Sequence, residues 1–188
     1  MTEKEKMLSG ALYDANNDKQ LIAERLDCKE LCRDYNDLRP KDFEARTLLL
    51  QRILGKVKGN LLIEQPFYCD YGYNITVGEN FYANFNLVIL DEAEVKFGDN
   101  VFIAPNCGFY TAGHPLDADE RNRGLEYAKP ITVGDNVWIG AGVSVLPGVT
   151  IGNNCVIGAG SVVTRDIPSD SVAVGNPCRI IKKIISNN

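Results

Sequence analysis

The sequence from Ile131 to Asp166 reads ITVGDN VWIGAG VSVLPG VTIGNN CVIGAG SVVTRD, six consecutive units of six residues in one phase. The third position of every unit is valine or isoleucine, the first is small or β-branched, and glycine fills the fourth position in four of the six units. Neither a helix, with its period of 3.6, nor a strand, with its period of 2, repeats every six residues. The pattern indicates a parallel β-helix of hexapeptide repeats, in which short strands alternate with Gly- and Asn-rich corners.

A single coil of such a helix cannot bury its own inward side chains. Successive coils are therefore expected to stack at the spacing of neighbouring strands, ~4.8 Å, with the third-position residues forming an aliphatic core. Glycine and asparagine suit the corners because the backbone there needs a positive φ, which costs other residues more. An antiparallel sandwich is the alternative, but its turn signals would recur every 8–12 residues. The predicted fold class is mainly β.

The composition is that of a folded protein of one domain with a small appendage: 188 residues, 45% hydrophobic and 24% charged. The net charge of −5 argues against nucleic acid as a partner. No apolar run approaches the roughly 18–20 residues of a membrane span. The charged N-terminus, MTEKEKMLSG, lacks the apolar stretch of a secretory signal. We therefore expect a cytoplasmic protein that acts without a membrane.

Six cysteines, at positions 28, 32, 69, 107, 155 and 178, are spread along the chain without a CxxC pair. Cys28 and Cys32 lie one helical turn apart, and Cys155 occupies a repeat position that is otherwise mostly valine. In the cytoplasm such residues are expected to stay reduced and to pack as small hydrophobic side chains. Because the chain has one histidine, no zinc or other metal site is expected.

Residues 1–56 have a different pattern from the coil. Between residues 21 and 35, apolar side chains recur near helical spacing in a charged background. A second helix is predicted to begin after Asp42, a candidate N-cap, and to close at Gly55. This helical segment can cap the open end of the β-helix, which would otherwise expose unpaired backbone. It can also form one wall of a ligand cleft, and the two roles are compatible.

The predicted coil occupies residues 57–188, and one long excursion interrupts it. Residues 111–129, TAGHPLDADERNRGLEYAK, depart from the period of six and hold the single histidine, His114. Long stretches without repeats inside a compact domain are usually functional or disordered. A solvated loop histidine is common, but one at the root of a loop that interrupts a regular coil is well placed for catalysis.

The C-terminal part is basic in an acidic protein. The period breaks after residue 166, and an extended piece, a turn at residues 175–177 and a basic tail follow. The basic side chains here are Arg165, Arg179, Lys182 and Lys183. They can form a solvated charged end or bind a phosphorylated ligand that lies along the coil, because arginine grips phosphate oxygens in pairs.

Several motifs in this sequence resemble one known family. They are CDYGYNI (69–75), FYANFN (81–86), IAPN (103–106), TAGHP (111–115), KPITVGDNVWIGAG (129–142) and VGNPCRIIKKI (174–184). They look like those of the maltose/galactoside O-acetyltransferases, and the helical N-terminus resembles the maltose-type branch. The resemblance covers nearly the whole chain. It implies a left-handed β-helix, a homotrimer with active sites between subunits, acetyl-CoA as co-substrate and a sugar hydroxyl as acceptor, with no metal.

The resemblance also implies two catalytic residues. His114 would be the general base that takes the proton of the sugar hydroxyl, and the acetyl group would pass directly, without an acyl-enzyme. Asn84, in the FYAN motif, would lie beside the thioester and donate its amide to the developing oxyanion. An asparagine at a repeat corner is the ordinary alternative for Asn84.

The same resemblance implies two sets of binding residues. Those for the acceptor are Asp14, Arg25, Asp70, Tyr82, Glu92 and Glu126, since carboxylates accept hydrogen bonds from sugar hydroxyls. Aspartate at position 70, where the galactoside branch has serine, favours a glucose- or maltose-like acceptor. Those for acetyl-CoA are Asn84, Trp138, Ala141, Ala159, Thr164, Arg165, Arg179 and Lys182. Trp138 is expected to form a groove wall or a trimer contact.

Two other functions compete with a sugar O-acetyltransferase. An antibiotic O-acetyltransferase would use the same scaffold, but such relatives generally lack a helical N-terminus. A trimeric binding scaffold without catalysis has no need of His114 or Asn84.

Overall fold

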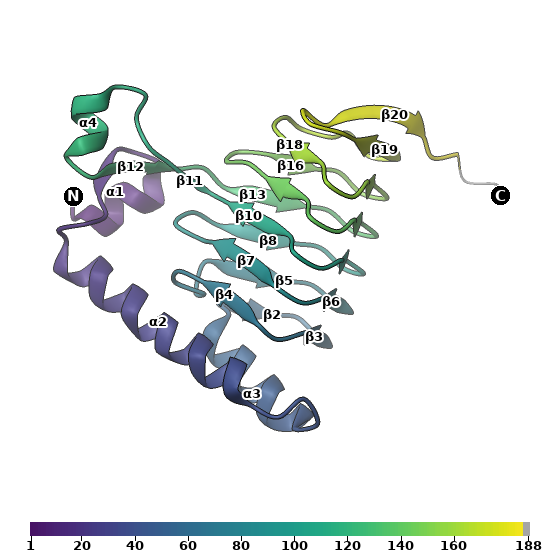
Figure 1. Ribbon diagram of the computed structural model, residues 1–188, viewed down its shortest axis with the longest axis horizontal. Helices are drawn as coiled ribbons and strands as arrows, with labels where there is room; N and C mark the ends of the chain where they lie inside the picture. Colours follow the sequence, from purple (N-terminus) through teal and green to yellow (C-terminus); the bar gives the residue numbers. More distant parts are fainter. Residues whose placement is uncertain (186–188) are drawn as a thin grey trace.

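The computed structural model describes residues 1–185, and Figure 1 shows the chain winding into a left-handed parallel β-helix. The predicted fold class and handedness are confirmed. The coils form three flat faces, each a sheet of parallel strands. The first face contains β2 (Lys56–Val57), β5 (Ile75–Val77), β8 (Val95–Phe97), β13 (Ile131–Val133) and β16 (Thr150–Ile151). The second contains β3 (Leu61–Ile63), β6 (Phe81–Ala83), β9 (Phe102–Ile103), β14 (Trp138–Ile139), β17 (Val156–Ile157) and β19 (Ser171–Val174), with β20 (Arg179–Lys183) antiparallel at its end. The third contains β4 (Phe67–Cys69), β7 (Leu87–Leu90), β10 (Gly108–Tyr110), β15 (Ser144–Val145) and β18 (Val162–Val163).

The predicted aliphatic core is confirmed. All six third-position side chains of the repeats between residues 131 and 166 are at most 1% exposed. Strand register stacks Val133 between Phe97 and Ile151. In the earlier coils the core is aromatic, and the ring centroid of Phe97 lies 5.1 Å from that of Phe81 and 4.9 Å from that of Phe109. Each buried side chain of this size contributes about 1.5–3 kcal/mol by leaving water, so stacking is what holds the coils together.

Asparagines form the corner between the first and second faces. Asn80, Asn100 and Asn136 have φ values of 55°, 55° and 57°, in the left-handed region that asparagine tolerates better than most residues. The amide of Asn80 donates to Asn100 Oδ1 at 3.0 Å, and that of Asn100 donates to Asn136 Oδ1 at 3.2 Å. The side-chain amides of the corner asparagines therefore hydrogen-bond to one another from coil to coil.

The other two edges of the prism carry the candidate site. We call the edge between the second and third faces the alanine edge, because Ala141 and Ala159 stack there on successive coils, in the same row of corners as Asn84. We call the edge between the third and first faces the loop edge, because residues 111–129 leave the coil there between β10 and β13.

The N-terminal segment closes the open end of the coil. It contains α1 (Glu3–Ser9), β1 (Tyr13–Asp14), α2 (Lys19–Asp37) and α3 (Phe43–Ile53). Buried side chains of α2 and α3 belong to one continuous hydrophobic cluster with the first coils. Arg46 on α3 reaches the same junction, donating to the carbonyl of Ile63 at 2.9 Å and to Glu64 Oε2 at 2.9 Å. The segment therefore caps the coil, as Figure 1 shows.

The excursion is a folded flap, contrary to the prediction of a stretch without regular structure. Residues 111–129 contain β11 (Ala112–Gly113), α4 (Ala118–Asn122) and β12 (Leu125–Ala128). Strand β12 pairs antiparallel with β11 and, on its other side, with β1 from the N-terminal segment. The N-terminal segment is therefore not purely helical. Its strand is only two residues long and pairs with a distant segment, so local periodicity does not reveal it.

The C-terminal residues form a hairpin, in which β20 runs antiparallel to β19 with Arg179 opposite Val174 and Lys182 opposite Val172. The last three residues of the predicted coil segment 57–188 lie outside the described residues. Within residues 1–185, no helix combines the length and the apolar character needed to cross a bilayer.

Candidate functional site

His114 lies immediately after β11, at the root of the flap. Its Nδ1 is 3.1 Å from the backbone carbonyl of Leu125 on β12. A carbonyl oxygen only accepts hydrogen bonds, so Nδ1 carries the proton and Nε2 keeps its lone pair. The side chain is 49% exposed. The hairpin thus presents to solvent an imidazole whose outer nitrogen can accept a proton.

Glu126, the next residue on β12, faces that nitrogen. Its Oε1 lies 3.8 Å from His114 Nε2, and its Oε2 accepts a hydrogen bond of 2.9 Å from the Tyr13 hydroxyl on β1. Burial, with the charge of Glu126 second, raises the pKa of Tyr13 far above its usual value, so the hydroxyl remains a donor. The pairing of β1 with β12 therefore fixes the carboxylate beside the imidazole.

Asp70 and Glu92 form an acidic pair at the loop edge below the flap. Asp70 follows β4, and Glu92 follows β7 and is 4% exposed. Burial, followed by the hydrogen bond to Asp70, raises the pKa of Glu92 to about 9. Glu92 is therefore protonated at neutral pH and can donate a hydrogen bond, while Lys29 Nζ lies 3.9 Å from Asp70 Oδ1.

Arg25 and Asp14 reach the same region from the N-terminal segment. Arg25 donates to the Tyr71 hydroxyl at 2.9 Å and to the Ala15 carbonyl at 2.7 Å, and its charge interacts favourably with those of Asp70 and Glu126. Asp14 lies opposite Leu125 in the β1–β12 pair. Partial burial raises its pKa, but hydrogen bonds from Asn17 and Asn16 lower it overall, so the Asp14 carboxylate is ionised.

Three of the residues predicted to bind acetyl-CoA follow the alanine edge. Asn84 Oδ1 accepts a hydrogen bond of 2.8 Å from the backbone amide of Phe85, which orients its side-chain amide. The Ala141 carbonyl accepts one of 2.8 Å from the amide of Gly160, beside Ala159. Small side chains here leave the backbone of two coils open to a ligand.

The second face carries an outward row of aromatic residues. Tyr82, Phe102 and Trp138 occupy equivalent positions on β6, β9 and β14, and Phe102 and Trp138 are 44% and 57% exposed. Tyr82, predicted to contact the acceptor, therefore lies on a different face from Asp70, Glu92 and Glu126. A stacked, exposed aromatic row is a surface suited to contact with another molecule.

Two of the four predicted phosphate or adenine contacts lie together. Arg165 and Arg179 both line a depression of about 130 Å³, and Thr164 directly precedes Arg165. Lys182 lies farther along β20, opposite Val172. All four side chains are exposed, and the two guanidinium groups near each other suit a phosphate.

One chain thus assembles the predicted residues as two separate groups. The group at the loop edge and flap contains Asp14, Arg25, Asp70, Glu92, His114, Glu126, Thr164 and Arg165. The group on the second face and alanine edge contains Tyr82, Asn84, Trp138, Ala141 and Ala159. Arg179 and Lys182 lie on β20 at the end of the second face, and Arg179 shares a depression with Arg165. No described hydrogen bond or ion pair within residues 1–185 joins His114 to Asn84.

The sequence did not indicate three residues that hold this site in place. Tyr13 orients Glu126, Tyr71 accepts from Arg25, and Lys29 pairs with Asp70. Each acts on a partner far away in the chain, so its role has no local signature. The sequence feature that comes closest to revealing these residues is a tyrosine among polar residues, because a buried hydroxyl needs a hydrogen-bond partner.

Comparisons with known proteins identify the family of this chain. The family model of the maltose acetyltransferase hexapeptide capping motif matches residues 6–59, and that of the bacterial transferase hexapeptide, with six repeats, matches residues 130–165. A maltose O-acetyltransferase from Clostridium difficile 630 is 56% identical with a TM-score of 0.96, over 99% of each chain. A galactoside acetyltransferase in complex with coenzyme A is 46% identical with a TM-score of 0.94, over 98% of this chain and 92% of that one. The hexapeptide-repeat acetyltransferase VCA0836 from Vibrio cholerae O1 biovar eltor, complexed with acetyl coenzyme A, is 36% identical with a TM-score of 0.90, over 99% of this chain and 100% of that one.

The coil and its N-terminal cap are those of a hexapeptide-repeat acetyltransferase. Within that class, the chain belongs to the maltose and galactoside O-acetyltransferase family.

Proposed function

We propose that this protein is an acetyl-CoA-dependent O-acetyltransferase that acetylates a hydroxyl of a sugar. The observation that carries the proposal is the state of His114: its Nδ1–H is tied to the Leu125 carbonyl, and its Nε2 faces Glu126 across 3.8 Å. That geometry is the one a general base needs, because the proton-accepting nitrogen is exposed and the other nitrogen is fixed.

In the proposed reaction, Nε2 of His114 removes the proton of the sugar hydroxyl as its oxygen attacks the thioester carbonyl. The tetrahedral intermediate then collapses, the C–S bond breaks, and the imidazolium returns the proton to the leaving thiolate of CoA. No acyl-enzyme forms. Glu126 stabilises the imidazolium by its charge, and the Asn84 NH₂ donates to the oxyanion, an interaction worth roughly 3–4 kcal/mol in such sites.

The proposed acceptor is glucose- or maltose-like. Asp70, Glu126 and Asp14 offer carboxylate oxygens to its hydroxyls, while protonated Glu92 and the Arg25 guanidinium offer donors. This mixture of donors and acceptors matches a polyol better than it matches a charged or apolar compound. The names of the similar maltose and galactoside enzymes support the same class of acceptor.

The proposed acetyl-CoA site is a groove between two chains of a homotrimer. Its candidate residues lie partly on the alanine edge and partly on the loop edge of one chain. The two walls of one groove therefore come from different chains, the alanine edge of one and the loop edge of its neighbour. The coenzyme A complexes of similar proteins support the ligand. We expect the enzyme to act in the cytoplasm, where acetyl-CoA is present and the six unpaired cysteines stay reduced.

The test is release of CoA from acetyl-CoA with the purified chain and a panel of glucose, maltose, galactosides and hydroxylated antibiotics. The expected result is sugar-dependent release, fastest with glucose- or maltose-like acceptors. Turnover with an antibiotic but with none of the sugars would contradict the proposal and favour a xenobiotic acetyltransferase. The absence of both turnover and CoA binding would contradict it in favour of a binding scaffold.

A further inference from the structure

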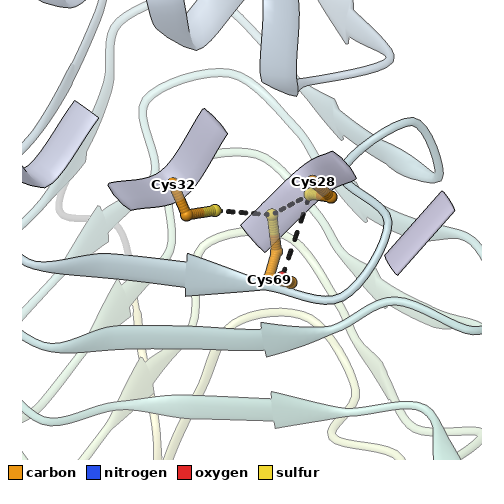
Figure 2. Close-up of side chains that lie close together, drawn as sticks. All are labelled: Cys28, Cys32 and Cys69. Atoms are coloured by element: carbon orange, nitrogen blue, oxygen red, sulfur yellow. Dashed lines mark hydrogen bonds between the residues drawn. The ribbon is translucent and has the colours of Figure 1, made fainter. Parts of the chain in front are cut away.

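Three buried cysteines meet where the helical cap joins the coil. Cys28 and Cys32 lie one turn apart on α2, and Cys69 ends β4; Figure 2 shows their sulfur atoms pointing toward one another. The Cys69 sulfur is 3.5 Å from that of Cys28 and 3.7 Å from that of Cys32. All three residues are at most 4% exposed. The proposed reaction uses none of them.

These distances fit a single ion bound by three sulfurs. The three sulfur atoms lie within 4.8 Å of one another. A triangle with edges of 3.5, 3.7 and at most 4.8 Å has a centre no more than about 2.4 Å from any corner, close to the ~2.3 Å of a zinc–thiolate bond. An ion can therefore reach all three sulfurs with little movement of the backbone. The cysteines outside this cluster, at positions 107, 155 and 178, take part in no such group within residues 1–185.

An open groove gives an ion access to the cluster. A groove of about 400 Å³ reaches Cys32 and Cys69, and Lys29 and Arg33 line it. The thiolate is the form that binds metals. The groove can supply a water molecule as a fourth ligand, since no carboxylate or imidazole joins the three sulfurs within the described residues.

We propose that Cys28, Cys32 and Cys69 form a binding site for one thiophilic d¹⁰ metal ion, of the Zn²⁺ class, that fastens the helical cap to the coil. Thiolate ligands select such ions over hard ions such as Mg²⁺ or Ca²⁺. Binding displaces the thiol protons to solvent, so affinity falls as pH falls. The site is structural, and the proposed acetyl transfer uses none of its three sulfurs. This proposal differs from the expectation, based on the single histidine, that the chain has no metal site.

The first experiment titrates the full-length chain with Cd²⁺ under anaerobic, reducing and metal-free conditions. The readout is the ultraviolet charge-transfer absorption of cadmium–thiolate bonds. We expect it to saturate at one ion per chain, and we expect Cys69→Ser to weaken binding by more than about tenfold, since even partners outside the ligand shell cost 10–100-fold. Cys32→Ser is the second variant, in case Cys69→Ser does not fold by circular dichroism.

Cys155→Ser is the matched control. Cys155 is equally buried, and its sulfur contacts the carbonyls of Asn153 and Pro168 at 3.5 and 3.3 Å, which a serine hydroxyl can also reach. We expect this variant to bind Cd²⁺ as the parent does. Absence of saturable absorption, or equal binding by folded Cys69→Ser or Cys32→Ser, would overturn the site. So would an intact mass two hydrogens lower in the reduced preparation, which indicates a disulfide instead.

The second readout is thermal unfolding with and without Zn²⁺. A ligand that binds only the folded state raises the melting temperature, so Zn²⁺ is expected to raise it in the parent chain and in Cys155→Ser but not in Cys69→Ser. A shift of equal size in all three would refute the assignment. Neither readout involves acetyl-CoA or a sugar, so failure here leaves the proposed function intact, and failure of the sugar assay leaves the metal site intact.

Discussion

At the scale of single residues, the candidate site depends on how the protonation of a few side chains is fixed. His114 is the single histidine of the chain, and the Leu125 carbonyl decides which of its nitrogens is free. Glu92 is kept neutral by burial and by Asp70. These two groups supply opposite functions at neutral pH: His114 accepts a proton, and Glu92 donates a hydrogen bond.

His114→Ala is expected to lower kcat for acetyl transfer by about 10²–10⁴-fold, because that is the usual contribution of a positioned general base. The measurement is steady-state release of CoA with the best acceptor of the panel. Asp119→Ala, an exposed change on α4 of the same flap, is the control and should keep the parent rate. Turnover by His114→Ala close to that of the parent would refute the role of His114.

Glu92→Gln is expected to make the free energy of unfolding fall less steeply as pH rises. The folded-state pKa of about 9 is above the ordinary glutamate value of 4.5, so between these values the folded chain holds a proton that the unfolded chain has lost. This group therefore contributes stability below pH ~4.5 that is lost as pH rises toward 9, with a slope of at most about 1.4 kcal/mol per pH unit.

The measurement for Glu92→Gln is the free energy of unfolding in urea at several pH values from 5 to about 9. The Glu64→Gln variant is the control, since the Glu64 carboxylate is more exposed and pairs with Arg46. An identical pH slope in the parent and in Glu92→Gln would show that Glu92 is ionised in the folded protein.

At the scale of elements, the helical cap combines ordinary capping chemistry with a buried junction. The Asp18 carboxylate at the start of α2 accepts a hydrogen bond of 2.8 Å from the amide of Leu21. Asp42 occupies the same position before α3 but makes no side-chain hydrogen bond there. The two helices therefore provide a matched pair for measuring a cap.

Asp18→Ala is expected to lower the free energy of unfolding by about 1 kcal/mol, because it leaves a helix amide without its partner. Asp42→Ala should change stability much less, since the lost carboxylate caps nothing. Both are measured by equilibrium denaturation in urea. Equal effects of the two substitutions would mean that the Asp18 hydrogen bond adds nothing to stability in solution.

At the scale of the whole molecule, the three-faced coil separates the two residues that the proposed reaction needs together. His114 leaves the loop edge, whereas Asn84 lies on the alanine edge. A rigid prism cannot bring two of its edges together, so the proposed site requires a second copy of the chain. Rings of identical subunits provide such heterologous contacts when the rotation closes.

Mixing two inactive variants tests this arrangement. If each site takes His114 from one chain and Asn84 from the next, co-refolded His114→Ala and Asn84→Ala chains form mixed trimers with one intact site. Random mixing in equal amounts should then restore up to about a quarter of the parent activity. No activity above the sum of the separate variants would contradict a site shared between chains.

Arg179→Ala is expected to raise the KM for acetyl-CoA more than it lowers kcat, because a phosphate contact remote from the thioester acts on binding. Lys56→Ala, which removes an exposed cation at the opposite end of the coil, is the control and should leave KM unchanged. An unchanged KM in Arg179→Ala would move the phosphate site away from the depression that Arg165 and Arg179 share.

The repeat by itself determined the coil. Valine or isoleucine at the third position of each unit from residue 131 to 166 forms one column when the coils stack, and the structure buries all six side chains. The two helices predicted before residue 56, α2 and α3, were also local, since their spacing lies within each segment, but α1 was not predicted. Hydrophobic periodicity and corner chemistry are properties of neighbouring residues, so they can be read along the chain.

Only the tertiary structure determined which residues that are distant in the sequence come into contact. Strand β1 pairs with the flap, Tyr13 holds Glu126, and Cys69 joins Cys28 and Cys32, although each partner lies tens of residues away. Contacts of this kind depend on how the cap docks onto the coil and on where the excursion turns back. No local repeat in the sequence predicts these contacts, because they arise from packing between elements that the sequence specifies separately.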